Sequence, residues 1–407
     1  MRSNPFLLVG FGGAGLRTLD AFDAMVAANS SHAHQLRENI YYFAVDTEQA
    51  AIQALQESIL RRSNGARGPY TTTCCLSQNI QNFDEIVRHV FDRFYGRPDD
   101  VGLSRLREHW WFDADGRPFR GWDGLNVMDG SGMSPVVAFT LAWHQMRMIE
   151  EKVGEILDNI KRRSMDCMDP ISRIRIYFVT SLAGGTGRGS WAPVMLKVKE
   201  VFRDRYRAFC HMTGLFFDAS IFADTVQGSP NEALAHKVNS LTGLSELSFW
   251  MDDDMRGMCR EPISVRLPDM VSPTNPEKDV LNIADEKEFM YSVSPVDDAY
   301  FICGQSSDYG RLASPNEYFQ MAGRALFTLC DTSDIEARLI NDSHVIRSFA
   351  PLVLTVDVAG LGVYFNYMAR KSVLAGIISE CGDVDGLHNF YPLQHFSDEV
   401  QFAESFS

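Results

Sequence analysis

The sequence predicts an α/β fold in which a doubly wound, mainly parallel sheet carries helices on both faces. Short runs that are apolar throughout alternate with longer segments whose apolar residues recur at helical spacing. Continuous apolar runs are typical of parallel strands buried on both faces, and strands that alternate with helices form mainly parallel sheets. Glycine-rich turns stand at three of the junctions between a run and a helix, and such sheets bind ligands at the carboxyl ends of their strands.

The expected elements follow these runs in chain order. Strands are expected over residues 5–10, 40–47, 174–180, 210–220 and 299–304, and β-like sequence returns at 351–365. Helices are expected over residues 16–28, 48–56, 83–95, 136–163, 191–206, 230–252 and 315–330, and the last of these can extend to about residue 346. The alternation is interrupted at about 60–125 and at 253–298, so both stretches are expected to be insertions.

Composition argues against several classes of partner. The chain has 53 acidic and 38 basic residues and a net charge of −15, which disfavours binding to nucleic acid. It contains no run of about 18 apolar residues, so no membrane span is expected. The eight cysteines form no C-x-x-C pair and mostly lie in apolar runs, as free thiols do in a reducing compartment. We therefore expect a cytoplasmic protein.

The three glycine-rich turns carry the strongest functional signal. They are the first loop, GFGGAG at residues 10–15, the second loop, GSGMSP at 130–135, and the third loop, GGTGRG at 184–189. Glycine lets a ligand approach the backbone, and a helix start offers unpaired N–H groups and a positive dipole end. Three such turns at one edge of a sheet supply enough donors for a polyphosphate. Asp46 and Thr47 end the second expected strand and would face the same crevice.

Other interpretations of the turns remain open. Each turn alone is also compatible with a tight strand-to-helix connection that binds nothing. The first loop fits G-x-G-x-x-G and would suit a dinucleotide-dependent oxidoreductase. Against this, Asp46 lies 31 residues beyond Gly15, whereas the ribose-binding acid usually follows by about 20. The chain has no G-x-x-x-x-G-K-[ST] motif, which disfavours a P-loop enzyme.

Taken together and in order, the motifs resemble those of the tubulin/FtsZ superfamily of nucleotide-dependent, filament-forming GTPases. LLVGFGGAG resembles its first phosphate loop, FAVDTEQAAI its second-strand segment and GSGMSP the loop beside the terminal phosphate. AGGTGRGSWAPV resembles the signature G-G-T-G-x-G with the helix start of the bacterial proteins, and GLSELSFWMD resembles a following helix. The resemblance covers roughly residues 5–365 and indicates a bacterial tubulin-like protein.

The resemblance implies a binding site for GTP or GDP, with Mg²⁺ held through the phosphates and not by protein side chains. The residues implied to hold the phosphates are Gly12, Gly13, Ala14, Gly184, Gly185, Thr186 and Gly187. Those implied to sense the terminal phosphate are Gly130, Ser131, Gly132, Met133 and Ser134. Asp46 and Thr47 would line the Mg²⁺-phosphate side, and Asn239 would contact the sugar or the base.

The chain departs from the superfamily pattern in three respects, which concern Arg188, the base-reading position and the catalytic acid. Arg188 replaces a small residue, and its side chain either neutralises a phosphate or points outward to a neighbouring subunit. Phe319 is the candidate to stack on the base, with a core position as the alternative; Gly323 stands where the superfamily carries an Asn or Asp that reads guanine. Asp357 is the candidate catalytic acid, with a solvated strand end as the alternative, so GTPase activity is implied by resemblance without an identified catalyst.

These observations define two main functional hypotheses. In the first, residues 1–346 form a tubulin-like nucleotide-binding domain that self-assembles through its nucleotide face with weak or no hydrolysis. Residues 347–407 then begin a second domain, which is short or missing, or form an extension. In the second hypothesis the chain is a non-polymerising regulatory or scaffold module that uses nucleotide as a structural or switching ligand. Segments 108–122 and 253–298 would then be surfaces for protein partners.

Overall fold

The computed structural model of the chain describes residues 5–28, 37–63, 70–80, 83, 86, 131, 133–166, 173–206, 209–225, 230–251, 294–304, 311–331 and 346–348. Two of the expected elements, most of the 83–95 helix and the β-like 351–365 segment, lie outside these residues. Segment 108–122 and most of 253–298 lie outside them too. The domain boundary at about residue 346 stays a prediction.

The described residues form a seven-stranded sheet in the order β3-β2-β1-β4-β5-β6-β7, and every neighbouring pair is parallel. The strands are β1 (Phe6–Phe11), β2 (Ile40–Asp46), β3 (Tyr70–Cys75), β4 (Arg173–Ser181), β5 (Phe209–Phe217), β6 (Asp298–Ile302) and β7 (Ile346–Ser348). The chain runs outward from β1 to β3 and then returns to the other side of β1. The order of the strands therefore reverses between β1 and β4, which is where such sheets open a ligand-binding crevice.

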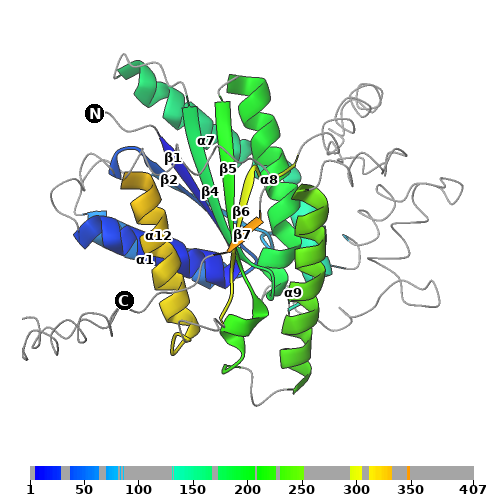
Figure 1. The fold of residues 1–407 in the computed structure, drawn as a ribbon. Helices are drawn as coiled ribbons and strands as arrows, with labels where there is room; N and C mark the ends of the chain where they lie inside the picture. Colours follow the sequence, from blue (N-terminus) through cyan, green and yellow to red (C-terminus); the bar gives the residue numbers. More distant parts are fainter. Residues whose placement is uncertain are drawn as a thin grey trace, which may run out of the picture. The chain divides into compact units, whose positions relative to one another are not determined.

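Helices cover both faces of the sheet, as the sequence predicts (Figure 1). They are α1 (Gly12–Ala28), α3 (Gln49–Ser63), α6 (Pro135–His144), α7 (Met146–Asp166), α8 (Gly185–Tyr206), α9 (Pro230–Met251) and α12 (Pro315–Asp331), with the 3₁₀ turn η3 (Ala219–Phe222). Helices α1, α3 and α12 pack on one face, and α6, α7 and α8 pack on the other. The doubly wound parallel sheet is thus confirmed.

Alternation along the central strand divides the core in two. In β1, Leu7, Val9 and Phe11 pack toward the α6–α8 side, whereas Phe6 and Leu8 pack toward the α1–α12 side. Every residue of β1 and of β2 is buried, because helices cover both sides. This explains why both strands are recognisable in the sequence as unbroken apolar runs.

Three elements differ from the expectation. Residues 346–348, near the point to which the helix expected from residue 315 could extend, form strand β7, and no strand is predicted there from the sequence. Strand β3 falls inside the stretch expected to be an insertion, and it is not predicted from the sequence. Its sequence YTTTCC is half-buried over its first four residues, so it is an edge strand rich in β-branched threonine and not an apolar run. The single helix expected over 136–163 is two helices, which are separated at Gln145, where φ is −93° and ψ is 13°.

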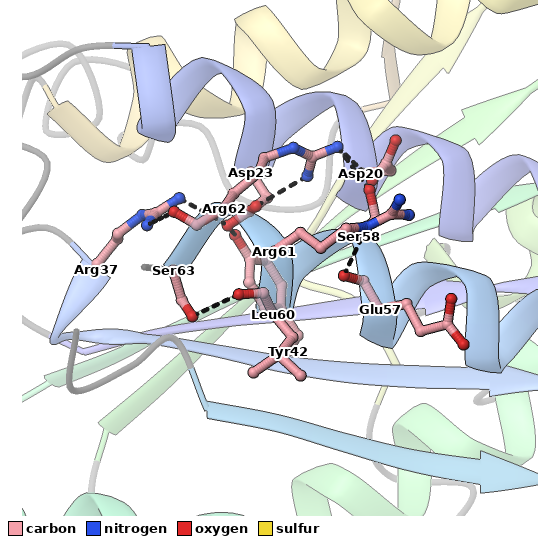
Figure 2. Close-up of polar contacts among 10 residues, drawn as sticks. All are labelled: Asp20, Asp23, Arg37, Tyr42, Glu57, Ser58, Leu60, Arg61, Arg62 and Ser63. Atoms are coloured by element: carbon pink, nitrogen blue, oxygen red, sulfur yellow. Dashed lines mark hydrogen bonds and ion pairs between the residues drawn. The ribbon is translucent and has the colours of Figure 1, made fainter. Parts of the chain in front are cut away.

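An ion cluster centred on the buried Asp23 joins α1, α3 and the segment before β2 (Figure 2). The Arg62 guanidinium of α3 lies 2.9 Å from Asp23 and 2.6 Å from Asp20, both on α1. Arg37 lies 3.8 Å from the Asp23 carboxylate and donates to the main-chain oxygen of Arg62. The Tyr42 hydroxyl of β2 donates to Asp23 at 3.3 Å. Two carboxylates and two guanidinium groups therefore fix the body of α1, the helix that begins at the first loop.

No helix in the described ranges combines the length and the apolar character that a membrane span requires.

Candidate functional site

The first and third loops meet at the carboxyl ends of β1 and β4. Gly12, the first residue of α1, has φ +63°, a left-handed conformation that favours glycine. A Cβ atom at Gly12 would lie 3.1 Å from the main-chain nitrogen of Gly187. A side chain at position 12 would therefore be strained and would press on the third loop.

The second loop packs directly on the third. A Cβ atom at Gly185 would collide with the Ser131 hydroxyl and would lie 2.8 Å from backbone atoms of Met133 and Ser134. The three loops expected to converge therefore do so, as far as the described residues extend. Gly130 and Gly132 lie outside those residues.

Two glycines of the loops instead face open space. Among the described residues, no atom outside the chain neighbours and the helix's own backbone lies within 4 Å of a Cβ built on Gly13 or on Gly184, and neither residue has a left-handed φ. Their backbone is therefore accessible to a ligand, and a Cβ atom at either position meets no steric obstacle there.

Two helices direct their amino ends at this junction. Helix α1 begins at Gly12 and α8 begins at Gly185, and neither carries an acidic residue in its first turn. Helix α6 begins at Pro135 after the second loop, and the Ser134 hydroxyl at its N-cap makes no capping hydrogen bond. Unpaired N–H groups and positive dipole ends at α1 and α8 favour an anion between them.

Three hydroxyl groups from separate parts of the chain meet beside the loops. The Thr186 Oγ1 atom lies 2.8 Å from Thr47 Oγ1 and 3.2 Å from Ser131 Oγ. Thr47 follows β2, Ser131 belongs to the second loop and Thr186 to the third. Hydroxyls can both donate and accept hydrogen bonds, so this cluster can rearrange around phosphate oxygens or metal-bound water. The sequence places these residues on loops but carries no signal that the hydroxyls touch.

Asp46 is buried at the same edge of the sheet, and one of its two carboxylate oxygens has no hydrogen-bond partner among the described residues. The side chain is 3% exposed, and its Oδ1 atom accepts from the main-chain nitrogens of Thr47 at 2.7 Å and Glu48 at 3.3 Å. Its Oδ2 atom is buried and has no hydrogen-bond partner among the described residues. Burial raises the pKa of Asp46 to about 6, against the lowering effect of the two main-chain donors. An unpartnered carboxylate oxygen of this kind suits a cation or a metal-bound water.

Asn239 lies on α9 and contacts the second loop and the residue before the third loop. Its side-chain nitrogen donates to the main-chain oxygens of Met133, in the second loop, and of Ala183, just before the third. Met133 has φ +65°, which is uncommon for a residue other than glycine. The Met133 sulfur also lies 3.2 Å from His236 Nε2, on the preceding turn of α9.

Arg188 adopts neither of the two orientations expected for it. Its side chain is 3% exposed and forms an ion pair with Glu246 of α9. Its Nε atom also donates to the main-chain oxygen of Asn239 at 3.4 Å. Burial raises the pKa of Glu246, and the neighbouring guanidinium opposes this shift. Arg188 therefore joins the start of α8 to α9 within the protein.

Phe319 lies in the hydrophobic core, which is the alternative that the sequence offers to stacking on a base. The side chain is 1% exposed, and its ring lies 5.2 Å from that of Phe217 and 6.3 Å from that of Phe222. The physical reason is that this face of α12 packs on the sheet, so the ring is enclosed by β5 and η3. Asp357, the candidate catalytic acid, lies outside the described residues.

Comparison with known proteins places the chain in a family. Its sequence matches the family described as Tubulin like over residues 7–342. No curated protein matches the sequence.

Several solved structures resemble the backbone. CetZ2 from Haloferax volcanii, solved as a GTPγS-bound protofilament, is 12% identical with a TM-score of 0.35, over 82% of this chain and 62% of that chain. An empty FtsZ dimer from M. jannaschii is 11% identical with a TM-score of 0.36, over 88% and 60%. A GTPγS-form protofilament of TubZ from Bacillus thuringiensis serovar israelensis is 11% identical with a TM-score of 0.30, over 80% and 56%. The chain spans less than two thirds of the length of each. Because the family match extends from β1 to beyond α12 and includes all three loops, the chain belongs to the tubulin-like family.

Proposed function

We propose that the chain binds GTP or GDP with Mg²⁺ at the junction of the three loops. The observation that carries the proposal is the convergence itself: Gly12 against Gly187 and Gly185 against Ser131 bring three turns together at one edge of the sheet. The open backbone of Gly13 and Gly184 leaves room for phosphate groups beside two helix starts. Family membership supports GTP as the nucleotide.

The remaining site residues take distinct parts in this proposal. Main-chain N–H groups at Gly13, Ala14 and Gly184 to Gly187 bind the phosphates, and the Thr186 hydroxyl adds a further donor. The second loop lies beside the terminal phosphate. Asp46 Oδ2 and the Thr47 hydroxyl face the Mg²⁺ ion through its water shell, which satisfies the buried carboxylate oxygen. Arg188 and Phe319 are not among the ligand contacts, because an ion pair and the core engage them.

We further propose that the chain self-assembles through this face in the cytoplasm, with weak or no hydrolysis. Bound nucleotide would complete the surface on which a neighbouring copy docks.

The binding proposal is tested with Gly13→Val and Gly184→Val. Both substitutions place methyl groups in the space proposed for phosphates, and the Cβ atom of each meets no atom of the described residues within 4 Å, its own chain neighbours and helix backbone aside. We expect wild type to bind Mg·GTP at low micromolar Kd or tighter, about −8 kcal/mol, and each variant to bind at least tenfold more weakly with its melting temperature nearly unchanged. Isothermal titration calorimetry measures the affinity, and mass spectrometry of the purified protein identifies any nucleotide carried through purification.

Gly185→Ala is the informative contrast. Its Cβ collides with the second loop, so we expect this variant to lose thermal stability together with binding. A wild-type protein that binds no guanine nucleotide would overturn the proposal.

A further inference from the structure

Helix α9 presents one row of residues to the second and third loops. His236, Asn239, Gly243 and Glu246 follow one another at intervals of three, four and three residues, which places them on a single helix face. Each makes a specific contact with a loop or with Arg188: His236 meets the Met133 sulfur, and Glu246 pairs with Arg188. The row ties α9 to both loops at once.

Asn239 is the centre of this row because one side-chain nitrogen joins the two loops. The distances from Nδ2 are 3.0 Å to the Met133 oxygen and 3.1 Å to the Ala183 oxygen. An amide nitrogen carries two hydrogens, and two main-chain carbonyls use both. The Asn239 nitrogen is therefore committed to holding the loops at a fixed separation.

Arg188 contacts the same face of the helix. Its guanidinium pairs with Glu246 and its Nε donates to the Asn239 carbonyl. A Cβ atom at Gly243 would lie 2.8 Å from the Arg188 side chain, so glycine at this position allows the arginine to pass close to the helix. The buried ion pair therefore fixes the position of α9, and with it Asn239, relative to the start of the third loop.

We infer that Asn239 is a positioning residue for the terminal phosphate of a nucleoside triphosphate. It differs from the sugar or base contact that the family resemblance implies, because its donors are directed at the loops. Asn239 fixes the distance between the second loop, proposed to lie beside the terminal phosphate, and the third loop, proposed to bind phosphates through its main-chain N–H groups. The inference rests on the proposed nucleotide site.

The test compares the affinities of three ligands, Mg·GTP, Mg·GDP and Mg·ATP, across four proteins. These are wild type, Asn239→Ala, the isosteric Asn239→Asp and the control Ser245→Ala, whose hydroxyl is exposed and donates only within its own helix. We expect Asn239→Ala to weaken Mg·GTP at least tenfold, Mg·GDP less than threefold, and to leave the ratio of GTP to ATP affinity unchanged. Asn239→Asp replaces the donors with an oxygen facing two carbonyls, so its loss of Mg·GTP is at least as large. Ser245→Ala should match wild type.

The outcomes separate a positioning role from the alternatives. A changed ratio of GTP to ATP affinity would assign Asn239 to the base and overturn the inference. Equal losses for GTP and GDP with a lower melting temperature would show a structural role only, and wild-type affinities would show no role. If Asn239→Ala fails to fold, the same comparison is made with Asn239→Asp. A wild-type protein without nucleotide affinity overturns the proposed function as well, so the two failures are distinguishable.

Discussion

Asp46 illustrates at the scale of one residue how a site can oppose the stability of its own fold. Its carboxylate is buried, Oδ1 is satisfied by two main-chain donors, and Oδ2 has no partner among the described residues. Ionisation of such a group is costly unless a ligand supplies the missing interaction. The same oxygen is what the proposed Mg²⁺ side of the site requires.

We predict that Asp46→Asn stabilises the ligand-free protein at neutral pH and weakens its binding of Mg·GTP. The pKa of Asp46 is raised from 3.8 to about 6, so in wild type the contribution of this group to stability is fully present below pH 4 and is lost as pH rises through 6. At 1.36 kcal/mol per pKa unit the loss is about 3 kcal/mol. Urea unfolding at pH 7.5 and pH 4 measures it: the gain from Asp46→Asn should appear at pH 7.5 and vanish at pH 4. A gain of equal size at both pH values would contradict this explanation.

The residue scale also shows where inference from sequence ends. The first and third loops could be predicted to converge because each links an apolar run to a helix in a parallel sheet, whereas the second loop is marked only by its glycines and by the helix that follows it. The partners of Arg188, Phe319 and Asn239 could not, since each depends on the distance between α9 or α12 and segments remote in sequence. Glu246, which determines the orientation of Arg188, has no sequence signal that distinguishes it from other helix acids.

At the scale of elements, the ion cluster of Figure 2 connects the stability of α3 to the placement of α1. Asp23 is fully buried, and burial raises its pKa against the opposing effects of Arg62 and Arg37. Removal of a guanidinium would leave a carboxylate that is buried without full compensation, which usually costs far more than an exposed ion pair contributes.

We predict that Arg62→Ala lowers the free energy of unfolding by about 3 kcal/mol. The neighbouring Arg61→Ala is the matched control, because Arg61 is exposed and donates only to the Glu57 carbonyl of its own helix; its change should stay within about 0.5 kcal/mol. Chemical denaturation of both variants gives the comparison. The effect of Arg62→Ala should be smaller at acid pH, where protonation of Asp23 removes the uncompensated charge. Equal stabilities for the two variants would show that the cluster contributes nothing.

Elements differed in how readily the sequence predicted them, for physical reasons. Strands β1 and β2 are enclosed by helices and therefore have unbroken apolar runs, and α9 begins at a proline and keeps its length as expected. Strand β3 is half-buried at the edge of the sheet, so its threonine-rich sequence contains no apolar run by which a strand could be recognised. The break between α6 and α7 occurs at one residue, Gln145, without a glycine or a proline to mark it.

At the scale of the whole molecule, the proposed assembly predicts polymers that depend on nucleotide. Wild type with Mg·GTP should sediment in a pelleting assay and show filaments by negative-stain electron microscopy, whereas Gly13→Val should do neither while it keeps its melting temperature. Nucleotide binding without any polymer would favour the alternative, a regulatory or scaffold module that uses nucleotide as a structural or switching ligand.

The contact of Thr186 with Thr47 and Ser131 has a consequence for how ligand and fold are coupled. These oxygens come from positions up to 139 residues apart, so they come together only after β2, β4 and the start of α6 have assembled. Unfolded protein offers no equivalent arrangement, so the proposed nucleotide would bind only the folded sheet and its affinity would add to the free energy of unfolding. Saturation at a hundred times Kd would add about 2.7 kcal/mol, and a chain cleaved between Thr47 and Thr186 would retain the ligand only while its two fragments stayed associated.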